Sequence, residues 1–485
     1  MQKFKKLIQI YRDSNVIVRA GIWFMLVTII DKGIAVLTQP IINRILSVDE
    51  VGIVGVYTSW RSVFSVLATF NLFGGVLEVN LTKTPEEKDN AVASLCSLSL
   101  FISMFFWGIF FVFGRGLSDL MGLKPVYMLI MALAVTAEAI IQFWAVPKRF
   151  EYSYKSYAIL IVGLFFFKSV LSVLLAYLLK NDRVLGRILG LAVPAVLIAV
   201  VLLFIIFGKK RTSSLFSYWK KGFLFNLPLI PHYLSSILLA SSDRIMIQQL
   251  NGESDAGLYT VAYSFASLTL IVFNALNSTY NPVSMKAIKD KNYTFLRKMT
   301  EVIVVLSVMF SVFMMLLAPE GLWLLGGDKY LSAMDIIPIL IVGIYLSSFY
   351  FVFSNVEFVY EKNKMIFPIT LLGAIINIVL NFFLVRLYGY KAAAYTTFVG
   401  YLFIAIAHYI VSERIVKEDI YNIKRLSAYV VILLAGGALS MFLYTVDNLI
   451  RYCFILVMFI VMALVLFKNR ESIMKMITKK DHSGQ

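Results

Sequence analysis

Apolar residues fill long, nearly uninterrupted stretches of this chain, and clusters of charged residues, Gly and Pro separate the stretches. A helix needs about 20 mostly apolar residues to cross a bilayer. These stretches reach that length, and they lack the period-two alternation of a membrane barrel strand. The pattern predicts transmembrane helices over residues 21–42, 51–77, 91–113, 125–146, 157–179, 184–207, 222–250, 257–280, 296–318, 336–360, 365–387, 392–411, 426–446 and 450–467.

Lys and Arg residues are distributed unevenly over the connections between these helices. If the N-terminus is cytoplasmic, the connections on that side carry 31 of the 45 Lys and Arg residues, and the opposite connections carry 11. Cytoplasmic connections of membrane proteins are enriched in these residues. The asymmetry predicts a multi-pass protein of the bacterial cytoplasmic membrane with about 14 crossings and both termini in the cytoplasm.

Composition excludes an ordinary soluble protein. Hydrophobic residues make up 60% of the chain and charged residues 15%, whereas typical soluble chains are about half apolar and about one quarter charged. The formal net charge of +17 is explained by the uneven connections, so nucleic acid is not expected as a partner.

Motifs of catalysis and metal binding are missing from the sequence. It contains no Gly-x-x-x-x-Gly-Lys-Ser/Thr phosphate loop, no His-Glu-x-x-His motif and no Cys-x-x-Cys pair. Its two cysteines, Cys96 and Cys453, lie in separate apolar stretches. We therefore expect no catalytic residue, no metal and no enzyme activity.

The predicted helices divide into two sets of six and a final pair. We expect an N-terminal six-helix lobe over residues 1–207, a basic cytoplasmic linker over 208–221, a second six-helix lobe over 222–411, and two additional helices with a basic tail over 412–485. An acidic residue, one apolar residue and Gly open the second helix of each set, at residues 50–52 and 255–257. Two such halves would share one orientation in the membrane, as in transporters built from parallel repeats.

Several segments of the second set resemble a known family. They are Pro228-Leu-Ile-Pro231-His-Tyr-Leu, Ser242-Asp243-Arg244-Ile-Met-Ile, Gly257-Leu-Tyr259-Thr-Val-Ala-Tyr263, and Asn377-Ile-Val-Leu-Asn381 followed by Tyr388-Gly389-Tyr-Lys-Ala392-Ala-Ala-Tyr-Thr396. With six, six and two spans, the chain resembles the polysaccharide-unit flippases of the multidrug/oligosaccharidyl-lipid/polysaccharide (MOP) exporter superfamily. The resemblance implies an all-α transporter with two MATE-like lobes that opens alternately to either side, and a lipid-linked oligosaccharide as cargo.

Three cations lie deep within the predicted spans of the first half: Lys32, Arg61 and Lys168. A charged side chain near the bilayer centre costs about 2.5–3.5 kcal/mol on insertion scales, so each needs a partner, water or a function. We predict that these cations line a water-filled cavity and bind an anionic substrate group such as a pyrophosphate. Internal ion pairing and snorkelling to the membrane surface are the alternatives.

Two carboxylates and one histidine are candidates for ion coupling. Asp31 and Glu138 could bind Na⁺ or a proton, or could pair with the three cations. His232 titrates near physiological pH and is a further candidate. Since no ATP-binding motif is present, we expect no cofactor and coupling to a gradient of H⁺ or Na⁺.

Prolines interrupt the seventh predicted span. Pro228 and Pro231 remove backbone hydrogen bonds, so this helix is predicted to bend and to act as a hinge. Asp243 and Arg244, near the other end of the same span, are predicted to form a gate or a bridge between helices.

Other polar residues fall within predicted spans. Asn226, Asn377 and Asn381 are predicted to make hydrogen bonds between helices, and the last two, four residues apart, share one helix face. Glu357 and Glu361 also share a face, and we expect them to be surface carboxylates neutralised by nearby lysines.

These observations predict a flippase that moves a polyprenyl-(pyro)phosphate-linked oligosaccharide repeat unit across the cytoplasmic membrane for cell-surface polysaccharide synthesis. Expected partners are this glycolipid, membrane lipids, and the polysaccharide polymerase and chain-length machinery. Three alternatives remain: a peptidoglycan-precursor flippase, an ion-coupled multidrug antiporter, and a non-transport scaffold of a glycan polymerase complex. The buried cations argue against the antiporter, whose cationic cargo favours an acidic cavity.

Overall fold

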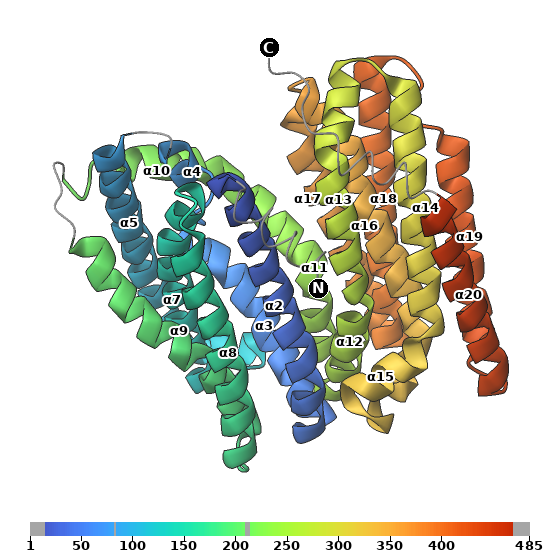
Figure 1. Ribbon diagram of the computed structural model, residues 1–485. Coiled ribbons are helices and arrows are strands. Elements are labelled where there is room, and N and C mark those ends of the chain that lie inside the picture. Colours follow the sequence, from blue (N-terminus) through green and yellow to red (C-terminus); the bar gives the residue numbers. More distant parts are fainter. Residues whose placement is uncertain (1–14, 82–83, 209–213, 469–485) are drawn as a thin grey trace, which may run out of the picture. The chain divides into compact units, whose positions relative to one another are not determined.

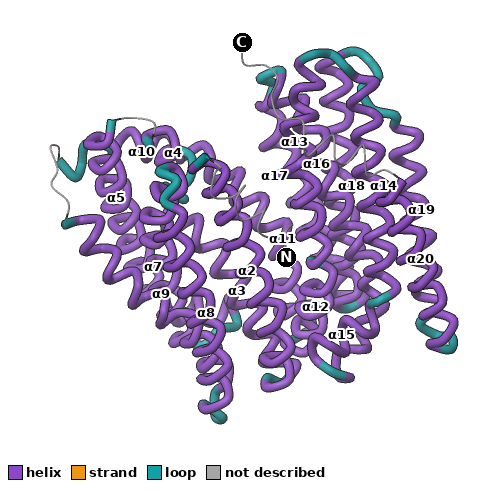
Figure 2. The backbone as a smooth tube through the Cα atoms, in the orientation of Figure 1, coloured by secondary structure: helices purple, strands orange, loops and turns teal. Residues whose placement is uncertain are grey.

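The computed structural model describes residues 15–81, 84–208 and 214–468 of the chain. The apolar stretches form helices because a helix satisfies its backbone hydrogen bonds internally, as a membrane requires. Within the described residues the regular elements are all helical, as Figure 2 shows. Thirteen helical segments are long and apolar enough to cross a membrane, and a shorter apolar helix over Asn448–Val461 lies where the last span is predicted.

The chain divides into two compact units, Met1–Ile237 and Leu238–Gln485, hereafter unit 1 and unit 2. The boundary falls inside helix α11, and the predicted linker over residues 208–221 lies within unit 1, with residues 209–213 outside the described residues. Unit 1 contains α2 (Val16–Ile45), α3 (Val48–Thr69), α4 (Val76–Asn80), α5 (Pro85–Val112), α6 (Gly114–Met121), α7 (Pro125–Phe150), α8 (Tyr154–Leu178), α9 (Arg183–Phe207), α10 (Trp219–Asn226), the 3-10 helix η1 (Leu227–Leu229) and the start of α11 (Ile230–Asn251) (Figure 1).

Unit 2 continues from the rest of α11. It contains α12 (Glu253–Ala266), α13 (Leu268–Lys289), α14 (Tyr293–Leu316), α15 (Ala318–Gly326), η2 (Asp328–Ile336), α16 (Ile337–Val359), η3 (Asn363–Met365), α17 (Ile366–Tyr388), α18 (Tyr390–Val416), α19 (Ile423–Leu443) and α20 (Asn448–Lys468).

Helix α3 starts and stops at clear local signals. The Ser47 hydroxyl accepts a hydrogen bond from the Glu50 backbone N–H, and the Glu50 carboxylate accepts one from the Ser47 N–H. This reciprocal capping box fixes the start of the helix. The helix ends where Phe70 and Asn71 adopt left-handed backbone conformations, with φ of 53° and 48°. The capping box and this break set the position of Arg61 between them.

Helices α8 and α9 pack with almost no space between their backbones. Gly186 and Gly190 form a Gly-x-x-x-Gly motif on α9, and a Cβ atom at Gly190 would lie 2.2 Å from the Cα of Ser172 on α8. Small residues at this spacing let membrane helices approach closely. The contact positions α8, which carries Lys168, firmly against α9.

Helix α16 is the central helix of unit 2 and packs against α13, α18 and α19. The two additional C-terminal helices are attached to this unit by ion pairs. Arg425, at the start of α19, donates to both carboxylate oxygens of Glu301 on α14, at 2.8 and 2.7 Å. Arg451 on α20 donates to Glu320 on α15. Helices α19 and α20 therefore belong to the fold of unit 2.

The close α8–α9 contact predicts that Gly190→Leu destabilises unit 1. The added side chain must displace the α8 backbone, and overpacking of this kind costs about 1–3 kcal/mol. Unfolding of the purified protein in detergent by heat or SDS measures the change. Gly163→Ala on α8 is the matched control, because a Cβ at Gly163 meets nothing within 4 Å; equal stability of Gly190→Leu and wild type would contradict the packing argument.

Asp182 links the starts of α7 and α9 and predicts an acid-dependent loss of stability. Its carboxylate accepts hydrogen bonds from Lys124 Nζ at 2.7 Å, Tyr127 Oη at 2.6 Å and the Leu185 N–H at 2.9 Å. Burial disfavours the ionised form, but these donors outweigh burial and hold the Asp182 pKa below its ordinary 3.8. The carboxylate therefore stabilises the fold above pH 3.8, and the contribution is lost as the pH falls through the lowered pKa.

We expect Asp182→Asn to melt at a lower temperature than wild type at pH 7, because the amide loses the charge that these donors favour. The difference should shrink as the pH falls below 3.8, where the wild-type carboxyl becomes protonated. Asp119→Asn, at an exposed position on α6, is the control. A melting-temperature difference that stayed constant with pH would show that the charge of Asp182 is not the cause.

Candidate functional site

A charged cluster joins three helices of unit 1. Arg61 on α3 donates to Oε1 of Glu138 on α7 at 2.7 Å, and Nζ of Lys168 on α8 donates to the same oxygen at 2.9 Å. These helices are membrane-spanning by length and composition. Two of the three cations predicted from the sequence are therefore brought together, with Glu138 as their shared partner.

The cluster carries more positive than negative charge. Two cations share one carboxylate, which leaves one positive charge in excess. The side chains of Arg61, Glu138 and Lys168 keep 28%, 33% and 14% of their surface exposed. The guanidinium and ammonium groups therefore retain donors that can reach a further anion, since each of these cations carries several N–H groups. The geometry thus shows the ion pairing that the sequence left as the alternative, together with an excess of cations, while the lining of a water-filled cavity stays a prediction.

Lys32 lies outside this cluster and is more exposed. Its ammonium is 3.8 Å from the carboxylate of the adjacent Asp31, and its side chain is 58% exposed. Asp31 also lies in the electrostatic field of Lys168. The α2 pair therefore extends the charged region of unit 1, although the structure pairs Lys32 with its neighbour and not with Glu138.

Arg187 is a fourth cation of this region that the sequence analysis did not select. It donates to the Ser172 hydroxyl, its Nε is buried without a hydrogen-bond partner, and no ion pair joins it to a carboxylate within the described part of the chain. Its charge and that of Arg61 interact. A signal for it was present, because Arg187 stands inside the Gly-x-x-x-Gly motif that brings α9 against α8.

The seventh predicted span is interrupted at its prolines, where a 3-10 turn separates α10 from α11. The 3-10 turn η1 contains Pro228, and Pro231 stands in the first turn of α11. Asn226, directly before η1, is buried, and its amide donates to the carbonyl oxygens of Phe70 and Asn71 at 2.9 and 3.0 Å. The interruption is therefore fixed to the left-handed break that ends α3.

His232 lies one residue after Pro231 in the same segment. Its ring packs beside Tyr233, and its Nδ1 is buried without a hydrogen-bond partner. Among the described residues, no ion pair joins His232 to a carboxylate. Its role in ion coupling stays a prediction.

Asp243 lies in a buried polar network of unit 2. Its carboxylate accepts hydrogen bonds from Tyr259 Oη on α12 at 2.7 Å, Asn381 Nδ2 on α17 at 2.6 Å and Thr397 Oγ1 on α18 at 2.7 Å. Ser242 and Asn377 extend the network through a hydrogen bond of 3.2 Å. Asp243, Asn377 and Asn381 thus connect α11, α12, α17 and α18.

Arg244 does not pair with Asp243. Its guanidinium lies 4.5 Å from the ring centroid of Tyr263 on α12, in a cation–π contact. The Asp243 network contains carboxylate, amide and hydroxyl oxygens, which are the ligand types that hard cations favour. Within the described residues, no group of three or more His, Cys, Asp and Glu residues could hold a metal ion.

The expectation for Glu357 is wrong. Its side chain is 0% exposed, and its Oε1 lies 2.5 Å from Nδ1 of His408 on α18, which is also 0% exposed. The lysines that follow Glu357 closely in the sequence indicate a surface position, but the face of α16 that carries Glu357 packs against α18. His408 offered no sequence motif, because its partner lies 51 residues away.

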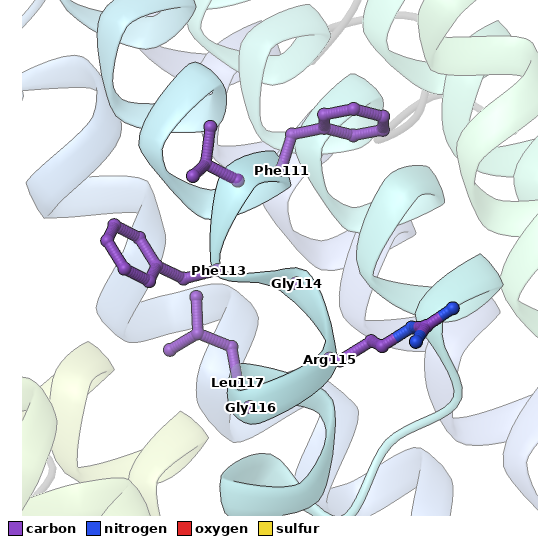
Figure 3. Close-up of a pocket in the computed structure, with 7 residues that line it drawn as sticks. Phe111, Phe113, Gly114, Arg115, Gly116 and Leu117 are labelled. Atoms are coloured by element: carbon purple, nitrogen blue, oxygen red, sulfur yellow. The ribbon is translucent and has the colours of Figure 1, made fainter.

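A surface cavity of about 680 Å³ lies where α5 turns into α6 (Figure 3). It is lined by Phe111 to Leu117, of which Arg115 supplies the charge. Figure 3 shows the Arg115 side chain pointing away from Phe113 and Leu117. The cavity holds none of the predicted site residues, and its exposed aromatic rings suit the membrane interface.

Comparison with known proteins identifies the family. The family model described as polysaccharide biosynthesis protein matches residues 17–288, and the MatE model matches residues 228–383. A product of the Lsg locus of Haemophilus influenzae is 27% identical over 241 residues. That match covers 48% of this chain and 58% of the relative, so the chain spans little more than half the length of this relative.

Solved structures show the same fold at low sequence identity. The lipid II flippase MurJ, in an inward closed conformation, has a TM-score of 0.69 at 14% identity over 93% of this chain and 100% of its own. An inward-facing MATE family transporter of the MOP superfamily has a TM-score of 0.60 at 15% identity, over 83% of this chain and 99% of its own. A MOP superfamily transporter from Pyrococcus furiosus has 0.55 at 14% identity, over 82% and 95%. The chain is thus a multi-pass membrane protein that belongs to the polysaccharide biosynthesis protein family.

Proposed function

We propose that this protein flips a polyprenyl-(pyro)phosphate-linked oligosaccharide repeat unit from the cytoplasmic to the outer leaflet of the bacterial cytoplasmic membrane. The observation that carries the proposal is the excess positive charge of the Arg61–Glu138–Lys168 cluster inside the membrane-spanning part of unit 1. Membership of a polysaccharide biosynthesis family supports a glycan as the rest of the cargo.

The cluster suits a diphosphate chemically. Arg presents a planar fork of donors that matches two phosphate oxygens, and Lys supplies a compact positive charge. Glu138 offsets part of the charge, which keeps the empty site tolerable in a medium of low dielectric constant. An arriving diphosphate can take over hydrogen bonds from Glu138 without any cation losing an anionic partner. The site can thus bind an anion and release it again.

The remaining steps follow from this binding. The head group would cross within the protein while the polyprenyl tail stays in lipid, and the interrupted segment around Pro228 and Pro231 would bend as the protein opens to either side. Both termini would lie in the cytoplasm, and a gradient of H⁺ or Na⁺ would drive the cycle. We include a polysaccharide polymerase and its chain-length machinery as partners that receive the unit.

A peptidoglycan-precursor flippase is the second candidate. One observation favours it: the match to the lipid II flippase structure extends over 93% of this chain and the full length of that structure. A cationic cavity is expected of both candidates, so the Arg61–Glu138–Lys168 cluster does not separate them. Direct competition between the two glycolipids in the assay below does separate them.

The proposal predicts that Arg61→Ala slows glycolipid transfer in liposomes containing the purified protein. Loss of a charge-assisted hydrogen bond of about 1.5–3 kcal/mol corresponds to roughly ten- to hundredfold. Arg61→Lys should keep part of the rate because it keeps the charge, and Arg115→Ala, at an exposed position on α6, should keep all of it. Export of a cationic dye without glycolipid transfer would overturn the proposal in favour of a drug antiporter.

Glu138→Gln should lower stability while leaving the cations in place. The substitution leaves Arg61 and Lys168 without their shared carboxylate, and breaking a fully buried pair costs about 3–5 kcal/mol. We expect less here because the three side chains are partly exposed. Binding of inorganic pyrophosphate to the detergent-solubilised variant should become tighter than to wild type. Weaker pyrophosphate binding by a folded Glu138→Gln protein would show that the carboxylate, and not the cations, organises the site.

A further inference from the structure

Glu357 and His408 form a titratable pair enclosed in unit 2. Both side chains are fully buried, and the contact between Glu357 Oε1 and His408 Nδ1 joins α16 to α18. The remaining polar atom of each residue, Oε2 of Glu357 and Nε2 of His408, is buried without a hydrogen-bond partner. Buried polar groups are nearly always paired, so this arrangement is costly and needs an explanation beyond packing.

The surroundings offer little compensation for charge. The ring of Tyr350 on α16 packs edge-on against His408 with centroids 5.1 Å apart. Apolar residues of α11, α17 and α18, namely Leu239, Ile369 and Ile404, form a buried cluster beside Tyr350. An ionisable residue within a membrane-spanning segment indicates function by default, because a packed apolar residue would be more stable there.

Titratable groups on and around α16 and α18 include Tyr350, Tyr401, Glu413 and the charged residues that follow α16. Tyr350 is the one on α16, and its hydroxyl feels the charge of Glu357. On α18, Tyr401 belongs to the same apolar cluster, while Glu413 stands farther along, where its carboxylate accepts from the Ile420 N–H. Beyond the end of α16, Glu361, Lys362 and, in η3 before α17, Lys364 are exposed. From α13, Asn281 and Ser284 bind Asn355 and carry no charge. Within the described residues, no further ion pair joins Glu357 or His408 to another charged side chain.

We propose that Glu357 and His408 together form a proton-binding site in unit 2, whose loading and release couple transport to the proton gradient. The coupling half of this inference rests on the proposed transport function, whereas proton binding does not.

The proton balance of the site is simple. With one proton on the pair the net charge is zero, whether the proton sits on Glu357 or on His408. Without it the carboxylate is ionised, the imidazole is neutral, and the net charge is −1. Burial away from water favours the loaded, neutral state. Release therefore requires water to reach the pair, so the helix ends around it must separate.

Helix α18 connects this site with the polar network of Asp243. Thr397, which donates to Asp243, precedes His408 on α18 by about three helical turns. A helix of that length transmits a displacement as a rigid element. Separation of α18 from α16 at His408 would thus shift Thr397, which donates to Asp243. Proton release would in this way change the polar network around Asp243.

Infrared difference spectroscopy tests proton binding directly. The full chain in lipid is compared between pH 6 and pH 9, a range in which exposed Glu residues, with ordinary pKa near 4.3, are already ionised. Wild type should show carboxyl or imidazole bands of a group that loses its proton in this range. Glu357→Gln should lose them, and Glu361→Gln, at an exposed position just beyond the end of α16, should keep them. His408→Gln is the second variant should Glu357→Gln fail to fold. Unchanged bands in either folded variant of the pair, or no band in wild type, would overturn the proposal.

Transport under an imposed pH gradient tests the coupling. One coupled proton shifts the distribution of cargo between leaflets by up to tenfold per pH unit. We expect wild type and Glu361→Gln to respond to the gradient, and Glu357→Gln to equilibrate the glycolipid without responding. A gradient response retained in Glu357→Gln refutes coupling through this pair. Absence of glycolipid transfer in wild type would refute the proposed cargo instead, and the infrared result would still decide on proton binding.

Discussion

Charge inside the hydrocarbon region must be compensated by the protein itself, and this constraint governs both units. Water is excluded there, so an unpaired ion costs several kcal/mol and helices are the elements that satisfy the backbone. In unit 1 the constraint is met at one oxygen atom, Oε1 of Glu138, which receives Arg61 and Lys168. This shared contact joins α3, α7 and α8.

The two units meet the constraint in different ways. Unit 1 keeps a surplus of cations, with Arg187 added to the central cluster and held by a hydroxyl group alone. In unit 2, Asp243 is surrounded by donors that are neutral, and Glu357 is matched one to one by His408. A surplus of positive charge attracts an anion, whereas neutral donors and a titratable pair suit small cations and protons. Unit 1 thus carries an excess of cations, whereas the described polar groups of unit 2 are balanced.

Much of the fold could be predicted from the sequence, because long apolar runs and basic connections reflect the membrane directly. The deep positions of Arg61 and Lys168 also followed from counting along helices. Their partner was harder to choose, since Glu138 and Asp31 were both available and only packing of α7 between α3 and α8 decides. Glu357 was misjudged for a related reason. Nearby lysines suggested a surface position. Whether a side chain is buried depends on the helix that packs against it, and the residues around Glu357 do not indicate that α18 packs there.

Asn226 has a consequence for how the protein is made. Its amide holds the carbonyl groups of Phe70 and Asn71, about 155 residues earlier in the chain. During synthesis the first six long helices of unit 1 leave the ribosome before Asn226 does. Until then the carbonyl groups of Phe70 and Asn71 lack the donor that the Asn226 amide supplies. Unit 1 therefore completes its packing in the membrane only when the segment leading into α11 has been inserted. Before that, the N-terminal helices lack one of the contacts of the folded unit.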